Sequence, residues 1–233
     1  MIVVGTTIPP YVMHEEDKWK GWLYNAEALL EQTDEEIRFF AAIEVDGRGL
    51  EPFGPLLEQL EALNGTFFTF SLDDGAEEIT TNNRLRRITM GQNLVTDYCV
   101  TVEADWLLFM AADCAYPANA LTDLIALGHP LVGGHVPTYC LDGPVVEQYR
   151  TSHGELVREH MATAAFVLLH SDIYRVVRWR WDIEHGSDDP CLHYDAMNFH
   201  STPTYVHHGV VGMHYPECIG SIESRHADRK IRK

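Results

Sequence analysis

A single carboxylate closes a short apolar run near the middle of the chain. Asp113 follows the apolar stretch 106–110 and two alanines, and a helical pattern begins after Pro117. Short apolar runs of this kind are typical of buried parallel strands. We therefore expect Asp113 where a strand opens into a loop, which is where open α/β sheets bind ligands. There it could hold a divalent cation, or it could simply cap the next helix.

Polar side chains also close three earlier predicted strands. They are Thr6 and Thr7, Glu44 and Asp46, and Asp73 and Asp74. Because parallel strands share one carboxyl edge, we expect these groups to meet Asp113 there. Acidic groups that meet at one edge favour a site in which some bind a base or a ribose hydroxyl group and others bind a divalent cation. The competing explanation is chance, since loops are polar in any protein.

The elements that must position these groups alternate between strand and helix. Strands are predicted at 2–8, 38–44, 65–71 and 106–110, and helices at about 18–32, 52–63, 83–98 and 117–128, the last with Pro117 near its first position and Gly128 as its stop. This alternation predicts a parallel sheet with right-handed crossovers.

The second half of the chain has a less regular pattern. It predicts a short strand at 131–134, a hairpin from 145–149 and 155–157, a buried strand at 162–169, and a strand and loop at 204–214. It also predicts two helices: one at 171–177 with Ser171 as its N-cap, and one that begins at 186–190 and has Cys191, Leu192, Ala196 and Met197 as its apolar residues. No repeat or linker divides the halves. The fold class is therefore α/β, with a mostly parallel central sheet flanked by helices in one domain.

Composition narrows the classes of function. The net charge of −18 argues against a broad footprint on nucleic-acid phosphates, although Arg84, Arg86 and Arg87 form a local basic cluster. Five cysteines without CxxC spacing favour a reduced intracellular protein with no structural zinc. No run of about 18 apolar residues suggests a membrane span. The start lacks a basic region typical of secretory signals, so a cytoplasmic location is expected.

The order of these elements resembles the GT-A glycosyltransferase fold over residues 1–217. Several motifs carry the resemblance: 2–9 resembles the opening strand, 43–47 the acidic turn that contacts the nucleoside, 87–93 the basic helix before the metal motif, 107–113 the Asp-x-Asp strand, 161–169 the small-residue strand under the donor sugar, 186–189 the acidic catalytic turn, and 206–214 the C-terminal strand and histidine. The resemblance implies a nucleotide-binding half at 1–113, an acceptor and catalytic half at 114–217, and a basic tail at 218–233.

The resemblance also implies a Mn²⁺ or Mg²⁺ site, with one departure from the family pattern. Ala111 stands where the family has the first Asp of its metal motif, which leaves Asp113. A nucleotide diphosphate and waters can supply the remaining oxygens. The second protein ligand is expected to be His214 or, almost equally, His208, whereas His207 fits a packed strand position. Without a metal, Arg84 or Arg87 would neutralise the diphosphate.

The activity that the resemblance implies is transfer of a sugar from a UDP- or GDP-sugar to an acceptor hydroxyl. In an inverting enzyme a carboxylate takes the proton of that hydroxyl. Asp189 matches this base, and Asp188 would orient it or bind acceptor hydroxyls, or would merely cap the next helix. Contacts to the donor are expected from Thr6, Thr7, Glu44, Asp46, Arg84, Arg87 and Ala112. The acceptor could be a glycan, a protein or a modified DNA base, as in bacteriophages, in which case the location would be the host cytoplasm.

Three other functions compete with this interpretation. A nucleotidyltransferase would ordinarily carry a Gly-rich, basic first loop, whereas residues 5–10 contain one glycine and no Lys or Arg. A sugar- or nucleotide-binding module that has lost catalysis is favoured by Ala111 and opposed by Asp113, Asp189 and His214. A zinc hydrolase finds little support, because the 13 histidines are scattered and no HExxH motif is present. Asp195 is expected on the surface, and Trp179 and Trp181 either pack or stack on a sugar or a base.

Overall fold

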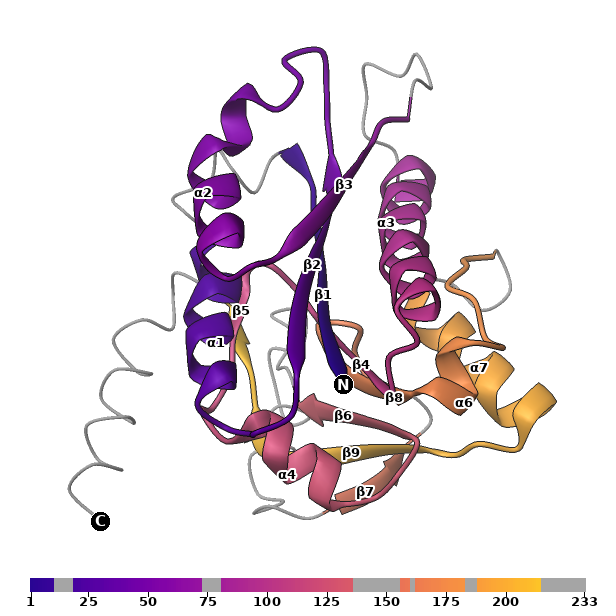
Figure 1. Ribbon diagram of the computed structural model, residues 1–233. Helices are drawn as coiled ribbons and strands as arrows, with labels where there is room; N and C mark the ends of the chain where they lie inside the picture. Colours follow the sequence, from indigo (N-terminus) through magenta and orange to yellow (C-terminus); the bar gives the residue numbers. More distant parts are fainter. Residues whose placement is uncertain (11–18, 73–80, 136–155, 160–161, 183–187, 215–233) are drawn as a thin grey trace.

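The computed structural model describes residues 1–10, 19–72, 81–135, 156–159, 162–182 and 188–214. One eight-stranded sheet runs through these segments in the order β3-β2-β1-β4-β8-β6-β9-β7 (Figure 1). The strands are β1 (Ile2–Ile8), β2 (Ile37–Glu44), β3 (Thr66–Phe70), β4 (Trp106–Met110), β6 (Leu131–His135), β7 (Leu156–Glu159), β8 (Phe166–His170) and β9 (Thr204–Val211).

The sheet combines a parallel half with a mixed half. Strands β1, β2, β3 and β4 pair in parallel, as the alternating pattern predicts. Strand β8 then runs antiparallel to both β4 and β6, while β6 and β9 are parallel and β7 is antiparallel to β9. The predicted fold class, a mostly parallel α/β sheet flanked by helices, is confirmed.

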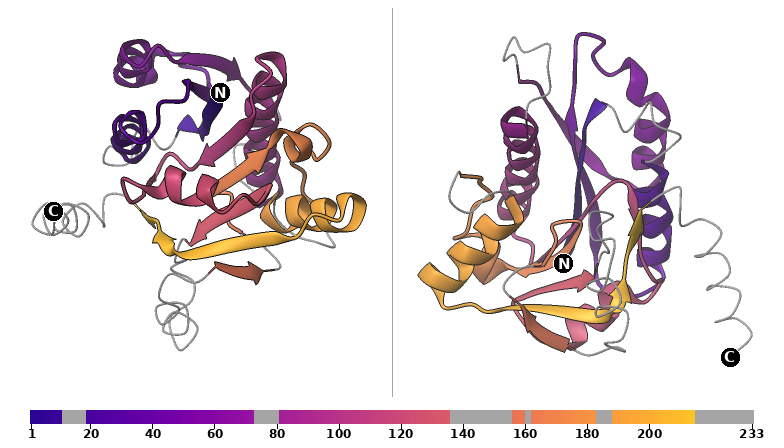
Figure 2. Two further views of the ribbon diagram at one scale, coloured as in Figure 1. Left: turned by 60° about the horizontal axis from the view of Figure 1, so that its bottom comes forward. Right: turned by 180° about the vertical axis from the view of Figure 1, so that it is seen from behind.

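Helices cover both faces of the sheet (Figures 1 and 2). One face carries α1 (Lys20–Leu30), α2 (Gly54–Ala62, after a 3₁₀ turn at Glu51–Phe53) and α4 (Ala120–Ala126), and the other carries α3 (Thr81–Thr101), α6 (Ser171–Tyr174) and α7 (Asp188–His200). Each layer buries its own apolar cluster, with Trp22, Leu56 and Leu121 on the first face and Val95, Ile173 and Leu192 on the second. Within the described residues, no helix is long and apolar enough to cross a membrane.

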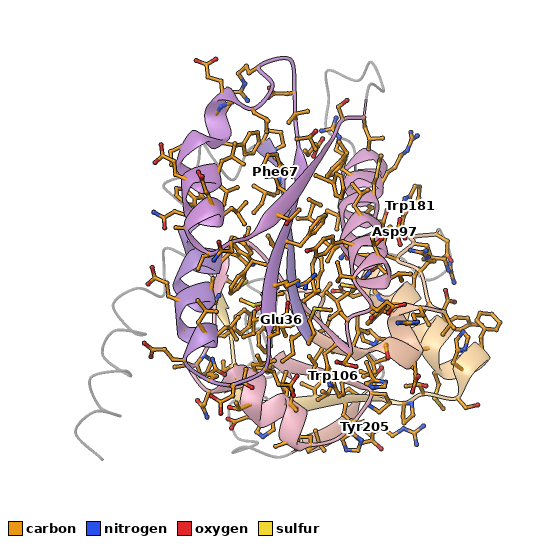
Figure 3. All side chains as sticks on the ribbon, viewed as in Figure 1. Glu36, Phe67, Asp97, Trp106, Trp181 and Tyr205 are labelled. Carbon is orange, nitrogen blue, oxygen red and sulfur yellow. The ribbon has the colours of Figure 1, made fainter. Side chains whose placement is uncertain are left out.

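Two glycines let α3 approach β1 closely. A Cβ atom on Gly5 would lie 2.1 Å from Val95 Cγ1, and one on Gly91 would lie 2.4 Å from Thr7 Cγ2. Neither glycine has a positive φ, so it is the space and not the backbone angle that requires them. Figure 3 places Glu36 and Trp106, near the starts of β2 and β4, at the lower end of the sheet. The carboxyl ends of these strands, and the start of α3, lie at the opposite end.

A small second sheet continues the chain beyond Asp113. It pairs β5 (Cys114–Ala115) with β10 (Met213–His214) in antiparallel fashion, with His214 opposite Cys114. The backbone of the late histidine therefore lies beside the residue that follows Asp113, although its side chain is outside the described part of the structure.

Several local predictions differ from the structure. The helix after Asp113 begins at Ala120 with Asn119 in the N-cap position, so Pro117 lies before the helix and not at its first position. Ser171 is not the N-cap of α6: His170 has the extended backbone of a cap and its side chain accepts a hydrogen bond from the Asp172 N–H. Met197 is 42% exposed, so it does not belong to the buried face of α7.

Only the second arm of the predicted hairpin lies within the described residues. The strand at its second arm is β7, and its described partner is β9, which comes later in the chain. The first predicted arm, 145–149, lies outside the described residues. So do Asp73, Asp74 and the basic tail, and the side chain of Arg84 is not described either.

Candidate functional site

One cavity of about 820 Å³ lies at the carboxyl edge of β1, β2 and β4. Helices α3 and α7 and the segment before β8 complete its wall. Its lining includes eight of the residues singled out from the sequence: Thr7, Glu44, Asp46, Arg87, Ala112, Asp113, Asp188 and Asp189. The structure therefore places these eight residues around one cavity, and their roles in binding or catalysis stay predictions.

The wall formed by β2 and α3 combines acids with arginines. Arg87 Nε lies 3.2 Å from Glu44 Oε1, and the Glu44 side chain is only 7% exposed. The exposed Asp46 accepts hydrogen bonds from the backbone N–H of Arg48, at 2.9 Å, and from its guanidinium group. Both arginines that line the cavity among the described residues therefore pair with carboxylates of the same wall. Their charge is partly balanced before any anionic ligand binds.

Helix α1 fixes the backbone around Asp113. The Asn25 side chain donates to the Cys114 carbonyl oxygen and accepts from the Tyr116 N–H, both at 2.7 Å, while Trp22 N–H donates to the Ala112 carbonyl oxygen at 3.1 Å. Asn25 is 3% exposed. This residue is not among those predicted from the sequence. The available signal was a polar side chain on the apolar face of a predicted helix.

The segment before β8 holds the same loop from the opposite side. Ala111 N–H donates to the Ala165 carbonyl oxygen at 2.8 Å, and the Tyr116 hydroxyl donates to that oxygen at 2.5 Å. The Tyr116 ring stacks on Phe166 with centroids 3.8 Å apart. The loop that carries Asp113 is thus held between α1 and the start of β8.

Two adjacent acids open α7 at the far wall of the cavity. The buried Asp188 accepts a hydrogen bond from Gln92 Nε2 of α3 at 2.6 Å. Asp189 Oδ1 accepts one from the Ala164 N–H at 2.8 Å. Burial, and next the charge of Asp188, raise the pKa of Asp189 from 3.8 to about 8, against the opposing effect of the Ala164 N–H and the Thr163 hydroxyl. Near neutral pH this pair therefore retains a proton.

A buried histidine supports the backbone under these acids. His193 is 2% exposed, its Nε2 lies 2.8 Å from the Ala162 carbonyl oxygen, and its Nδ1 lies 2.8 Å from the Thr204 hydroxyl oxygen. Burial lowers the pKa of His193 to about 4, so the ring is neutral at physiological pH. Like Asn25, this residue was not predicted from the sequence.

Several predicted residues lie elsewhere. Thr6 is fully buried in β1 and is not in the cavity lining. His208 is buried in β9, with Nε2 3.4 Å from Glu159 Oε1, and it is also absent from the lining. The structure therefore does not bring His208 to the cavity with Asp113. The described residues contain no group of three or more His, Cys, Asp or Glu side chains arranged to hold a metal ion.

Two further expectations about side chains can be compared with the structure. Asp195, expected on the surface, is only 15% exposed as a side chain and accepts hydrogen bonds from Arg180 Nε and a terminal nitrogen at 2.7 and 2.8 Å. Trp179 is buried and packs against Phe109, so it is a core residue and not a stacking platform. Trp181 is partly exposed, and the cavity lining does not include it.

Comparisons with known proteins show the fold. No protein-family model matches the sequence, and no curated protein matches it either. Among solved structures, a nucleoside-diphosphate-sugar pyrophosphorylase from Vibrio cholerae RC9 superposes with a TM-score of 0.53 at 10% identity, covering 90% of this chain and 94% of that chain. Because the identity is so low, this likeness indicates a shared fold and no more.

Two other solved structures overlap less well. A197 from STIV gives a TM-score of 0.44 at 11% identity, over 92% of this chain and 86% of that chain. The galactosyltransferase LgtC, in complex with donor and acceptor sugar analogs, gives 0.40 at 15% identity, over 73% of this chain and 58% of that chain. Because both TM-scores lie below 0.5, nothing further follows from these two likenesses.

Proposed function

We propose that the protein is a glycosyltransferase that moves a sugar from a nucleotide-sugar donor to an acceptor hydroxyl. The observation that carries the proposal is one cavity whose described lining includes Asp113, which follows β4, and the acids Asp188 and Asp189 of α7. A sugar transferase needs groups that stabilise the leaving diphosphate and a base for the acceptor, and these must face the same substrate.

In this proposal the nucleoside binds along the wall of β2. Glu44 and Asp46 would accept hydrogen bonds from base or ribose groups, and Arg87 would contact the phosphates. Thr7 and Ala112 line the same cavity, between that wall and Asp113. The ion pair between Arg87 and Glu44 already orients the guanidinium group.

A divalent cation fits this cavity only with help from the ligand. Asp113 offers a carboxylate of the type that Mg²⁺ and Mn²⁺ prefer, and the described residues supply no complete cluster. When bound, Mn²⁺ or Mg²⁺ would neutralise the developing charge of the diphosphate. Asp113 and His214 would hold it, since the His214 backbone pairs with Cys114.

Asp189 is the proposed base in an inverting reaction. A carboxyl group is a stronger base when its pKa is raised toward the working pH, and burial has this effect on Asp189. Its hydrogen bond from Ala164 orients the carboxyl group, and the acceptor hydroxyl would approach it from the cavity that Asp189 lines. Asp188 would orient Asp189 or bind a hydroxyl group of the acceptor.

The experiment is a two-stage assay of UDP- and GDP-sugars. Binding with and without Mn²⁺ is measured as thermal stabilisation, because a ligand that binds only the folded state raises the melting temperature. Turnover is then measured with glycan, protein and modified-base DNA acceptors, and the anomeric configuration of the product is determined. Binding without hydrolysis or transfer would support the catalytically impaired module instead. Retained configuration would refute Asp189 as an inverting base.

A nucleotidyltransferase is the second candidate, because the pyrophosphorylase from Vibrio cholerae RC9 shares the fold. The first loop argues against a nucleotidyltransferase, because Pro9 and Pro10 line the cavity where that class would be expected to have a basic, Gly-rich loop. The two activities are separated by adding pyrophosphate to a bound nucleotide sugar. Formation of a nucleoside triphosphate would establish the second candidate in place of the first.

A further inference from the structure

Gln92 is a buried amide in the cavity wall whose two ends have different surroundings. It lies on α3, is 1% exposed and lines the cavity. Its Nε2 donates to Asp188 Oδ2 at 2.6 Å. A carboxylate accepts hydrogen bonds, so this contact sets the orientation of the amide and leaves Oε1 as the other end. Among the described residues, Oε1 has no hydrogen-bond partner.

A second buried polar atom lies close by. Thr7 Oγ1, at the end of β1, also has no hydrogen-bond partner in the described part of the chain. A Cβ atom on Gly91 would lie 2.7 Å from this oxygen, so the Thr7 hydroxyl lies against the backbone one residue before Gln92. Buried polar groups are nearly always satisfied in folded proteins. Two unsatisfied atoms in one cavity wall therefore point to a ligand that supplies the missing partners.

The chemistry of the two atoms defines that ligand. A carbonyl oxygen only accepts, so Gln92 Oε1 needs an O–H or N–H donor, whereas the Thr7 hydroxyl can either donate or accept. Neighbouring hydroxyl groups on a sugar ring meet both needs. The position of Gln92 along α3 indicates that it faces the sugar and not the nucleoside. Arg87 pairs with Glu44 on the proposed nucleoside wall. Gln92 lies five residues, or about 7.5 Å, further along the helix, beside Asp188.

We propose that Gln92 and Thr7 form a subsite that reads hydroxyl groups of the donor sugar, with Gln92 also holding Asp188 in position. This inference rests on the proposed function, because it assigns a part of the same donor. It adds a specificity-determining residue, Gln92, that the resemblance to known transferases did not assign. The sugar would donate to Gln92 Oε1 and exchange a hydrogen bond with Thr7.

The test compares a nucleotide sugar with its own nucleoside diphosphate. Calorimetry with the full chain and Mn²⁺ gives the dissociation constants of UDP-glucose, UDP-galactose and GDP-mannose and of UDP and GDP. In Gln92→Met the affinity advantage of the nucleotide sugar over the diphosphate should fall about 10-fold, because a buried hydrogen bond to the sugar is lost. Affinity for the diphosphate alone should stay within about 2-fold, as no diphosphate contact is removed.

Asn93→Ala supplies the matched control. Asn93 is the neighbouring amide on α3, but both of its hydrogen bonds go to the Trp179 backbone and it does not line the cavity. Its removal should lower the melting temperature and leave the affinity advantage unchanged. The subsite would be overturned if Gln92→Met kept the affinity advantage of the nucleotide sugar over the diphosphate. It would also be overturned if the variant lost affinity equally for both ligands.

Gln92→Glu provides a second readout that a purely structural role would not produce. At acid pH the new carboxyl is protonated and can still donate to Asp188, whereas at alkaline pH two carboxylates would repel each other. The affinity advantage should therefore approach that of the wild type near pH 5.5 and fall at pH 8.5. The other titratable groups of the described lining are the same in both proteins: Glu44, Asp46, Arg48, Arg87, Asp113, Asp188 and Asp189. An advantage that does not vary with pH would contradict the inference.

The two levels of proposal fail differently. If no nucleotide sugar binds or is turned over by the wild type, the transferase proposal fails and takes the subsite with it. If the wild type transfers sugar and Gln92→Met keeps its full preference for the nucleotide sugar, only the subsite fails.

Discussion

The two halves of the sheet place their cavity residues by different means. In the parallel half, Thr7 and Glu44 lie in the last residues of β1 and β2, and Asp113 lies just beyond β4. The shared direction of these strands brings the three residues to one edge. In the mixed half, Asp188 and Asp189 stand at the start of a helix. Contacts to residues far away in the chain hold them there, namely Gln92 and Ala164.

This difference decides how each half should respond to substitution. A strand-end residue is positioned by the backbone hydrogen bonds of the sheet, so removing the side chain of Asp113 should leave the backbone in place. Glu44 is the exception, because its buried side chain pairs with Arg87. A helix-start acid shares its hydrogen bonds and its proton with other groups, so its removal alters their charge as well. A loss of activity without loss of stability is therefore expected for Asp113 in the first half, and coupled losses are expected for the acids in the second.

The largest effect is expected for Asp113→Ala. If this carboxylate supports the cation at the leaving diphosphate, kcat/KM for sugar transfer should fall about 10³-fold. The melting temperature should change little, because Asn25 and Trp22 hold the backbone around Asp113 independently of its side chain.

Asp97→Ala is the control for this variant. Asp97 lies on the exposed side of α3 (Figure 3), where it pairs with Arg178. Surface ion pairs of this kind contribute little, so activity and stability should both stay near the wild type. Full turnover in Asp113→Ala would remove the basis of the metal-assisted mechanism.

Asp189→Asn should lower kcat about 10²-fold through loss of the base. Because burial raises the pKa of Asp189 to about 8, wild-type kcat should rise with pH up to that value and then level off. The variant should show no such rise. Asp195→Asn, on the same helix but outside the described cavity lining, should keep the wild-type profile.

The same variant predicts a change in the pH dependence of stability. A carboxyl whose pKa is higher in the folded state binds its proton more tightly there, so wild-type stability declines as pH rises from about 4 through about 8. Asp189→Asn removes this decline. The melting temperature of the variant, relative to that of the wild type, should therefore rise between pH 5 and pH 9. A difference that stays constant over this range would argue against a buried proton shared by the two acids.

Much of this architecture could be predicted from the sequence. The strand of Asp113 and the strand ends at Thr7 and Glu44 follow from apolar runs and polar stops, and parallel geometry brings them together. The antiparallel insertion of β8 between β4 and β6 could not be inferred, because no local pattern records which strand is the neighbour. The same holds for Gln92, Asn25 and His193, whose partners are 96, 89 to 91, and 11 to 31 residues away in the chain.

His208 shows the limit of reading by residue type. An imidazole suits Mn²⁺, and residue type and spacing separate His214 from His208 only slightly as candidate ligands. The sheet separates them: His208 lies within β9 beside Glu159, while the β10 pairing brings the His214 backbone next to Cys114. The backbone position therefore supports His214 in the proposal, and its role as a ligand stays a prediction.

A smaller effect is expected for Gly91→Ala, which tests how the two halves meet. The new Cβ would lie 2.4 Å from Thr7 Cγ2, so α3 or Thr7 must move and the free energy of unfolding should fall by about 2 kcal/mol. Gly54→Ala is the matched control, since Gly54 is helical and an added Cβ meets nothing within 4 Å. The helix propensity of alanine is offset there by the following Pro55, so the stability of this variant should stay within about 1 kcal/mol of the wild type. Equal effects at the two positions, measured by denaturant unfolding, would mean that the close approach of α3 is not required.

The smallest effect is expected for Tyr116→Phe, which tests the contact between the Asp113 loop and the mixed half. The change removes the hydrogen bond to the Ala165 carbonyl oxygen and keeps the stacking on Phe166, so unfolding should become easier by about 1 kcal/mol. Because Ala165 also accepts from the Ala111 N–H, the loop should stay in place and the KM for the donor should rise only slightly. Tyr205→Phe, whose ring stacks on His129, is the control for loss of a hydroxyl group. A large loss of kcat in Tyr116→Phe alone would mean that Asp113 depends on the mixed half for its position, and that the strand end does not suffice to place it.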